Sequence, residues 1–338
     1  MNIPTMVKET MKISKVKLTV ILLMLSFYSI GTETSSLELS KIVPENYQNL
    51  SACEKRDILW DKVEKTEYTS LPTFSSFGAK ELISMAFQSM KTKVQRNSDV
   101  SPPKWKKYLH RRGSVAQVEF IPKETVPYTG FLKGSECALL RLSLTYRPSK
   151  NRNFAPGLAL KVLRTGRPSA NVSALYRLEG QDKNYNFFKN PLSNIVPTGS
   201  GFGLSIVNKI FKRVTNYPEE LGITHLAENL EVNKNNAEKK QAPRQIFFVP
   251  TLTEKFSDQP HDVREDFHSI LPGTKIFKVY AVGPKYLNYD YGQYQSSDIE
   301  KFVQEAIHIG DLVTKTRFLS SAFGDEGLFF RHEVRKKE

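Results

Sequence analysis

Apolar and polar residues alternate over several stretches of the chain. In residues 138–145, Leu140, Leu142 and Leu144 alternate with polar neighbours. A period of two residues predicts a β-strand with one apolar and one polar face. Comparable segments, several of them bounded by glycine or proline, predict further strands at residues 115–120, 158–163, 245–249, 275–282 and 306–317.

Helical periodicity is confined to a few segments. Residues 79–96 carry apolar side chains at three- and four-residue steps, which predicts an amphipathic helix. The prolines at positions 102 and 103 end it. A short helix is also expected at residues 206–214, whereas residues 37–78 lack a clear period and predict an extended lead-in.

Dispersed strands with few helices predict an α+β domain built on a closed antiparallel β-barrel with peripheral helices. The alternation within strands favours a barrel with a polar or ligand-facing interior. At 338 residues the chain is long enough for one large core. We expect a lead-in with one amphipathic helix at 36–100, the barrel at 101–330 and a basic tail at 331–338.

The N-terminus has the layout of a secretory signal peptide. A basic stretch at residues 12–17 precedes an uncharged apolar run at 18–30 and a small, polar segment at 31–36. The apolar run is shorter than the roughly 20 residues that a membrane span needs. Residues 1–35 therefore predict a secreted protein, and the alternative is a protein tethered to the membrane by an uncleaved signal anchor.

Export affects the interpretation of charge, cysteines and sequons. The net charge of +14 favours acidic surfaces or anionic lipids, and nucleic acid is not expected as a partner outside the cell. Cys53 and Cys137 are candidates for a disulfide, with two unpaired thiols as the alternative. Asn49 lies in a sequon within a polar stretch and is expected to carry a glycan. Asn171 lies in a sequon within a predicted strand, where a glycan does not fit.

Common active-site motifs are absent from the sequence. It contains no Gly-x-Ser-x-Gly, His-Glu-x-x-His or Cys-x-x-Cys motif and no phosphate-binding loop. No two of the six histidines lie at the spacing of metal ligands. Considered alone, His110 is a loop histidine beside a basic cluster.

Four segments in this order resemble the distal half of the catalase family. Catalases have a His-x-x-Gly loop before the first barrel strand, then an Arg-Phe-Ser strand, a Pro-Arg-Gly-Phe-Ala-Val-Lys-Phe segment and an Asn-Asn-Thr-Pro-x-Phe-Phe segment. This chain has Leu-His-Arg-Arg-Gly at 109–113, Leu-Arg-Leu-Ser at 140–143, Ala-Pro-Gly-Leu-Ala-Leu-Lys-Val at 155–162 and Asn-Tyr-Asn-Phe-Phe at 184–188. The resemblance implies a barrel of the catalase type.

The resemblance also implies haem as a cofactor and hydrogen peroxide or an organic (lipid) hydroperoxide as a substrate. His110 matches the histidine that moves the peroxide proton, and Asn184 or Asn186 matches the amide that polarises the peroxide. Ser143 matches the serine that hydrogen-bonds this histidine. Arg141 matches an arginine that steadies a haem propionate, and the alternative is an outward-facing charge.

The chain departs from the catalase pattern at two positions. Lys107 stands where catalases have an arginine three residues before the histidine, and it lacks the bidentate fork that binds a propionate. Catalases bind iron through a tyrosine that follows an arginine by four residues. Arg213 and Tyr217 form the only such pair in the sequence, so Tyr217 is the candidate iron ligand, and the alternative is a chance pair in which Tyr217 packs at a helix end. A cluster of four tyrosines offers a substitute ligand or, as the alternative, forms a solvated aromatic loop: Tyr286, Tyr289, Tyr291 and Tyr294.

Two alternatives to a haem enzyme remain. The first is a haem-free catalase-fold barrel that serves as a secreted binding or structural module. The second is an unrelated secreted β-protein that binds polysaccharide or lipid.

Overall fold

The structure is a computed structural model that describes residues 43–74, 84, 99–101, 106–107, 110–125, 132, 136–147, 152–166, 169–175, 192–193, 246–252, 261–281 and 306–330. The chain divides into two compact units, Met1–Glu38 and Leu39–Glu338, and every described residue belongs to the second. The signal segment, the helix expected at 206–214 and the basic tail lie outside the described residues. So does the helix expected at 79–96, apart from Ser84, which is helical.

Eight antiparallel strands form the described part of the domain. They are β1 (Arg112–Pro122), β2 (Ala138–Arg147), β3 (Arg152–Val162), β4 (Ala170–Leu175), β5 (Leu192–Ser193), β6 (Ile246–Pro250), β7 (Lys275–Ala281) and β8 (Ile307–Thr314). Each of the strands that the alternating pattern predicts is present.

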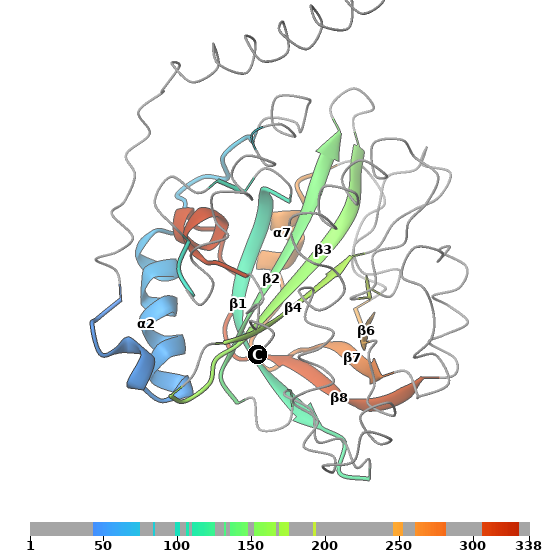
Figure 1. Ribbon diagram of the computed structural model, residues 1–338. Coiled ribbons are helices and arrows are strands. Elements are labelled where there is room, and N and C mark those ends of the chain that lie inside the picture. Colours follow the sequence, from blue (N-terminus) through green and yellow to red (C-terminus); the bar gives the residue numbers. More distant parts are fainter. Residues whose placement is uncertain are drawn as a thin grey trace, which may run out of the picture. The chain divides into compact units, whose positions relative to one another are not determined.

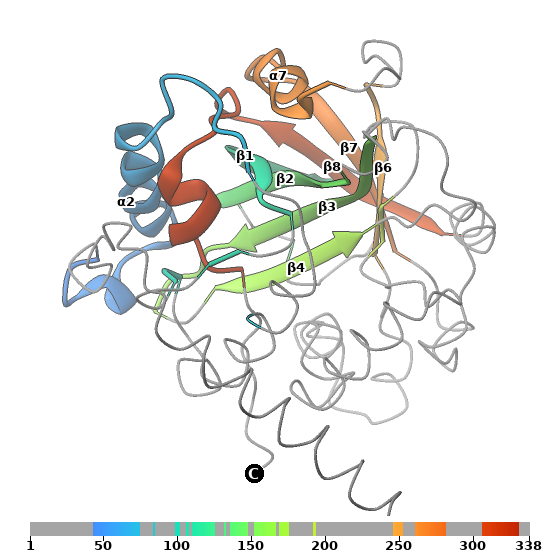
Figure 2. The same ribbon diagram turned by 90° about the horizontal axis from the view of Figure 1, so that it is seen from above.

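The strands pair in chain order, and β8 pairs back with β1, so the order of pairing is circular (Figures 1 and 2). Strand pairing is weakest at β5, where one residue pair joins β4 to β5 and two residue pairs join β5 to β6. The other seven strands make up a curled sheet with longer ladders. The expected β-rich, barrel-like antiparallel fold is confirmed at this level.

The inner face of the curled sheet is mostly apolar. On β2, Leu140, Leu142 and Leu144 are fully buried and share one cluster with side chains from β1, β3, β4, β6, β7 and β8. Each buried leucine contributes about 1.5–3 kcal/mol. The expectation of a polar interior is therefore wrong, because the polar positions Arg141 and Ser143 alternate onto the outer face.

Besides the longer helix α2, described below, the described residues contain three short helices. They are the 3₁₀ turn η3 (Tyr47–Asn49), the helix α7 (Val263–His268) and the π-helix η8 (Phe323–Gly327). Six residues are too few to show helical periodicity, so α7 was not predicted. Among the described residues, no helix has both the length and the apolar character that a membrane crossing requires.

The helix α2 (Ala52–Lys65) lies where the sequence predicts an extended lead-in, so that expectation is wrong over this stretch. A capping box begins it. The Ser51 hydroxyl accepts a hydrogen bond from the Glu54 backbone N–H, and the Glu54 carboxylate accepts one from the Ser51 backbone N–H at 2.9 Å. These bonds satisfy donors that a helix start leaves open.

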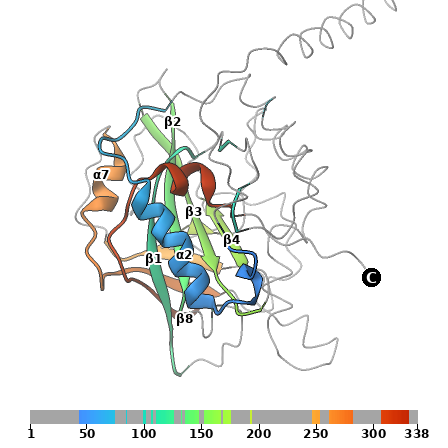
Figure 3. The same ribbon diagram turned by 90° about the vertical axis from the view of Figure 1, so that its left-hand side faces the viewer.

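One narrow face of α2 packs on the outside of the barrel. Leu59, Trp60 and Val63 are buried in a cluster that includes Val115 of β1 and Leu139 of β2. Figure 3 shows α2 and η8 on the same side of these strands. The apolar stripe is too narrow, among charged neighbours, to show a helical period in the sequence.

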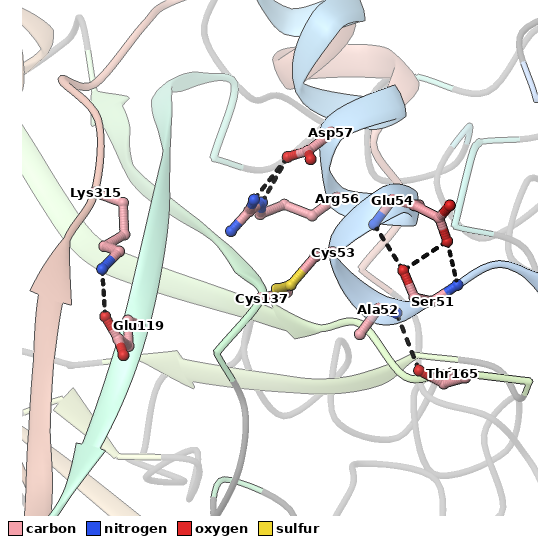
Figure 4. Close-up of a disulfide and its surroundings, with 10 residues drawn as sticks. All are labelled: Ser51, Ala52, Cys53, Glu54, Arg56, Asp57, Glu119, Cys137, Thr165 and Lys315. Atoms are coloured by element: carbon pink, nitrogen blue, oxygen red, sulfur yellow. Dashed lines mark hydrogen bonds and ion pairs between the residues drawn. A yellow bond between two sulfur atoms is a disulfide. The ribbon is translucent and has the colours of Figure 1, made fainter.

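A disulfide joins Cys53 of α2 to Cys137, the residue before β2 (Figure 4). Their Cα atoms lie 5.1 Å apart, and 84 positions separate them in the sequence. The structure therefore contains the disulfide and not the alternative of two unpaired thiols. The Ala52 backbone N–H also donates to Thr165 Oγ1 at 3.2 Å, which fixes the same end of the helix.

The two sequons lie in different environments. Asn49 is exposed at the end of η3, so its side chain is accessible to modification. Asn171 of β4 is only 3% exposed. A glycan does not fit at the second position, as expected.

Candidate functional site

Small residues form the outer face of β1, β2 and β3 around Ser143. Gly113 of β1 and Gly157 of β3 lie directly opposite Ser143 on either side. Arg141 and Ala159 follow one step along the same face. The two glycines leave space beside Ser143, and the Arg141 guanidinium occupies the space over Gly113.

His110 lies two residues before β1, beside this floor of small residues. Its φ of 54° is in the left-handed region, which is unusual for a residue with a side chain and costs of the order of 1 kcal/mol. Such a conformation persists only where neighbouring contacts impose it.

The His110 imidazole is neutral around neutral pH. Burial lowers its pKa to about 4, the Arg141 charge lowers it further, and a hydrogen bond with the Ser143 backbone opposes both effects. The ring nitrogen Nδ1 is buried and has no hydrogen-bond partner among the described residues. This side chain can therefore accept a proton.

Arg141 holds the His110 loop against β2. Its Nη2 donates to the His110 carbonyl oxygen at 2.7 Å and to Asp325 Oδ1 at 2.9 Å. Gly113 makes room for it, because a Cβ at that position would lie 2.6 Å from Arg141 Nη2. The guanidinium faces outward from the sheet, as the alternative has it, but it is only 4% exposed and is paired with Asp325.

Two carboxylates of η8, Asp325 and Glu326, complete the cluster. Burial raises the pKa of Asp325 to about 6, against the opposing charges of Arg141 and Lys107. The Lys107 backbone N–H donates to Glu326 Oε2 at 2.7 Å, and its Nζ donates to the Leu328 carbonyl oxygen at 2.7 Å. Burial, together with Arg141, lowers the pKa of Lys107 to about 7.

Sequence reasoning assigned no chemistry to Asp325 or Glu326. The available signal was a pair of adjacent carboxylates between two glycines at 324–327, at the end of the last strand region. Without the fold, nothing links this segment to Arg141, which lies 184 positions earlier.

Ser143 differs from its expected role. Its hydroxyl donates to the Gly157 carbonyl oxygen at 3.3 Å, and the contact with His110 comes from the Ser143 backbone instead. The β2–β3 register shifts between Ser143 and Thr145.

The remaining site predictions lie outside the described residues. These are the polarising amides Asn184 and Asn186, the iron ligand Tyr217 and the tyrosine cluster at 286–294. Within the described part of the chain, no group of three or more His, Cys, Asp or Glu side chains is placed to hold a metal ion.

A second buried polar network lies on the same outer face. Lys161 of β3 donates to Asp99 Oδ1 at 2.8 Å and to Ser169 Oγ at 2.9 Å, while the Tyr47 hydroxyl donates to Asp99 Oδ2 at 2.9 Å. Burial tends to raise the pKa of Asp99, but Lys161 and these hydrogen bonds lower it overall. With each charge paired, the network ties η3 and residues 99–101 to the barrel.

Comparison with protein-family models and with curated proteins finds no match for this chain. The likeness to catalases therefore depends on the order of the four sequence segments, and the geometry around His110 is independent of it.

Proposed function

We propose that this domain is a catalase-type barrel that acts on a hydroperoxide, with haem bound against the outer face of β1, β2 and β3. One observation carries the proposal. A neutral histidine, His110, presents a buried and unpartnered ring nitrogen beside Arg141 and a floor of small residues. A histidine and an arginine are among the groups that the resemblance to catalases assigns to this side of a haem.

The described residues fit haem in two respects. The histidine is neutral, as a proton acceptor has to be. Arg141 keeps a buried Nε–H without a partner among the described residues, which a propionate oxygen could accept.

The chain's own contribution to the reaction is proton transfer. Haem, when bound, supplies the iron and the electrons that break the O–O bond. With haem bound, His110 Nδ1 would hold the proton that passes between the two peroxide oxygens. Arg141 holds the carbonyl of His110 and so positions the ring.

A haem-free binding module is the second candidate, and the ion pairs of the site favour it. Arg141 is already paired with Asp325, and the Lys107 ammonium is bound to the Leu328 carbonyl oxygen. The two cations that the resemblance assigns to propionates are thus partly occupied by the chain itself.

Export is part of the same proposal. The Cys53–Cys137 disulfide supports it, because such bonds persist mainly in oxidising compartments. Secretion remains the proposed location, and an uncleaved anchor at residues 1–35 is the alternative. Acidic surfaces or anionic lipids remain the proposed further partners.

The test is turnover of hydrogen peroxide and of linoleic acid hydroperoxide by the haem-loaded protein. His110→Gln should lower turnover by about 10²-fold, because the proton acceptor is lost. His308→Gln is the matched control, since His308 lies in β8 and pairs with Asp311. Equal turnover by wild type and His110→Gln, or no turnover by the loaded wild type, would contradict the proposal.

A further inference from the structure

The π-helix η8 carries Asp325 close to the start of the barrel. Gly324 allows this close approach, because a Cβ at that position would lie 2.9 Å from Val115 Cγ2 of β1. The Gly324 backbone N–H donates to Ser321 Oγ at 2.8 Å, and the Asp325 backbone N–H donates to the Ser321 carbonyl oxygen at 3.0 Å. The backbone that carries the Asp325 side chain is thus fixed beside β1.

The buried Asp325 carboxylate, at 2% exposure, has one hydrogen-bond partner among the described residues, the Arg141 side chain. Its Oδ2 is buried without any partner there. The buried carboxylate of Asp99 differs, because Lys161 donates to its Oδ1 and Tyr47 to its Oδ2. Within the described part of the chain, the hydrogen bonding of Asp325 therefore acts on the site through Arg141.

Arg141 links Asp325 directly to His110. The same nitrogen, Nη2, donates to Asp325 Oδ1 at 2.9 Å and to the His110 carbonyl oxygen at 2.7 Å. The place of the Asp325 oxygen therefore determines where Nη2 lies, and hence where the His110 carbonyl is held. The left-handed backbone of His110, with φ of 54°, needs such a contact to persist.

The same C-terminal segment also holds the chain before His110. Glu326 Oε2 accepts a hydrogen bond from the Lys107 backbone N–H at 2.7 Å, and the Leu328 carbonyl oxygen accepts one from Lys107 Nζ at 2.7 Å. The segment leading to His110 is thus attached to residues 325–328 at two places, one of them through Arg141.

We propose that Asp325 is a positioning residue of this site, which holds His110 in place through Arg141. What Asp325 does for the reaction rests on the proposed function, whereas its effect on His110 can be measured without haem. The competing account is that the Asp325 carboxylate only neutralises the Arg141 charge. Positioning requires an acceptor oxygen at this place, and neutralisation requires a negative charge.

Titration of the His110 C2 proton by NMR, in the full chain without haem, separates the two accounts. In the wild type this pKa is about 4. Asp325→Ala removes the acceptor and exposes His110 to water, so its pKa should rise towards 6.5 by about one unit or more. Asp325→Asn keeps an acceptor oxygen, so the His110 pKa should stay within about half a unit of the wild type.

Asp311→Ala is the matched control, because Asp311 of β8 is also a partly buried carboxylate in an ion pair, with Lys275. It should leave the His110 pKa unchanged. If Asp325→Ala does not fold, Asp325→Leu fills the space of the carboxylate without an acceptor and should give the same rise. An unchanged or lowered His110 pKa in these variants, or an equal change in Asp325→Asn, overturns the inference.

Turnover by the haem-loaded protein tests the consequence for the reaction. Asp325→Ala should lower kcat about tenfold or more and leave KM unchanged, because the proton acceptor is displaced while peroxide binding is retained. Asp325→Asn should restore most of kcat. Turnover by Asp325→Ala equal to that of the wild type overturns the inference. Absence of turnover in the loaded wild type contradicts only the proposed function, and the NMR comparison still decides whether Asp325 positions His110.

Discussion

The environment of His110 sets its protonation state and links the stability of the fold to pH. Burial and the nearby Arg141 lower its pKa from the ordinary 6.5 to about 4. Between these values the unfolded chain takes up a proton that the folded chain does not. The stability contributed by His110 is therefore present above pH 6.5 and is lost as the pH falls towards 4.

Removing the imidazole should make the stability of the fold depend less on pH. His110→Gln is expected to lose less stability than the wild type between about pH 7 and about pH 5, by about 1–2 kcal/mol. Urea unfolding of both proteins at the two pH values measures the difference. If both proteins lose the same unfolding free energy between the two pH values, the pKa of His110 is not lowered by burial.

The buried pair of Arg141 and Asp325 gives a second prediction for single residues. Arg141→Met leaves the Asp325 carboxyl buried without its partner, so unfolding free energy should fall by about 3 kcal/mol. Arg317→Met is the matched control, because the Arg317 side chain is 66% exposed and its pair with Glu67 should contribute less than about 1 kcal/mol. Equal losses for the two variants in urea unfolding would contradict the difference in burial.

For individual elements, periodicity was informative where an element is long and has one buried face. The strand at 138–145 is recovered as β2 because its alternating leucines face the core. The same pattern did not reveal which face is inside, since both faces of β2 are covered and Arg141 is as buried as the leucines are. Helix α2 was missed because tertiary packing and the disulfide, more than a broad apolar stripe, hold it.

The candidate site was predictable only in part. Family resemblance pointed to His110, Ser143 and Arg141, and the structure brings them together on one face. Their partner Asp325 comes from a segment far along the chain, and its contact with Arg141 follows from the topology of the sheet. Contacts between residues so far apart in the chain cannot be predicted from local sequence patterns.

The disulfide makes α2 testable as an element. Cys53→Ser combined with Cys137→Ser should lower the unfolding free energy by about 2–4 kcal/mol, because the cross-link closes a long loop in the unfolded chain. Urea unfolding with and without a reductant measures it. The reductant should destabilise the wild type and leave the double variant unchanged, and a wild type insensitive to reduction would contradict the cross-link.

Over the whole molecule, the two faces of the sheet differ in composition. The inner face is an apolar core shared by strands all around the curled sheet. The outer face of β1 to β4 carries most of the buried polar groups of these strands, and α2 and η8 cover part of it. Chemistry is therefore expected at the outer face, between the barrel and the segments that pack on it.

The most direct test of a haem-binding barrel is the absorption spectrum of the purified protein during titration with hemin. The proposed function predicts a Soret band that saturates at one haem per chain, with a high-spin spectrum typical of a tyrosinate ligand. A well-folded protein that leaves the hemin spectrum unchanged would contradict it, and would favour the haem-free binding module.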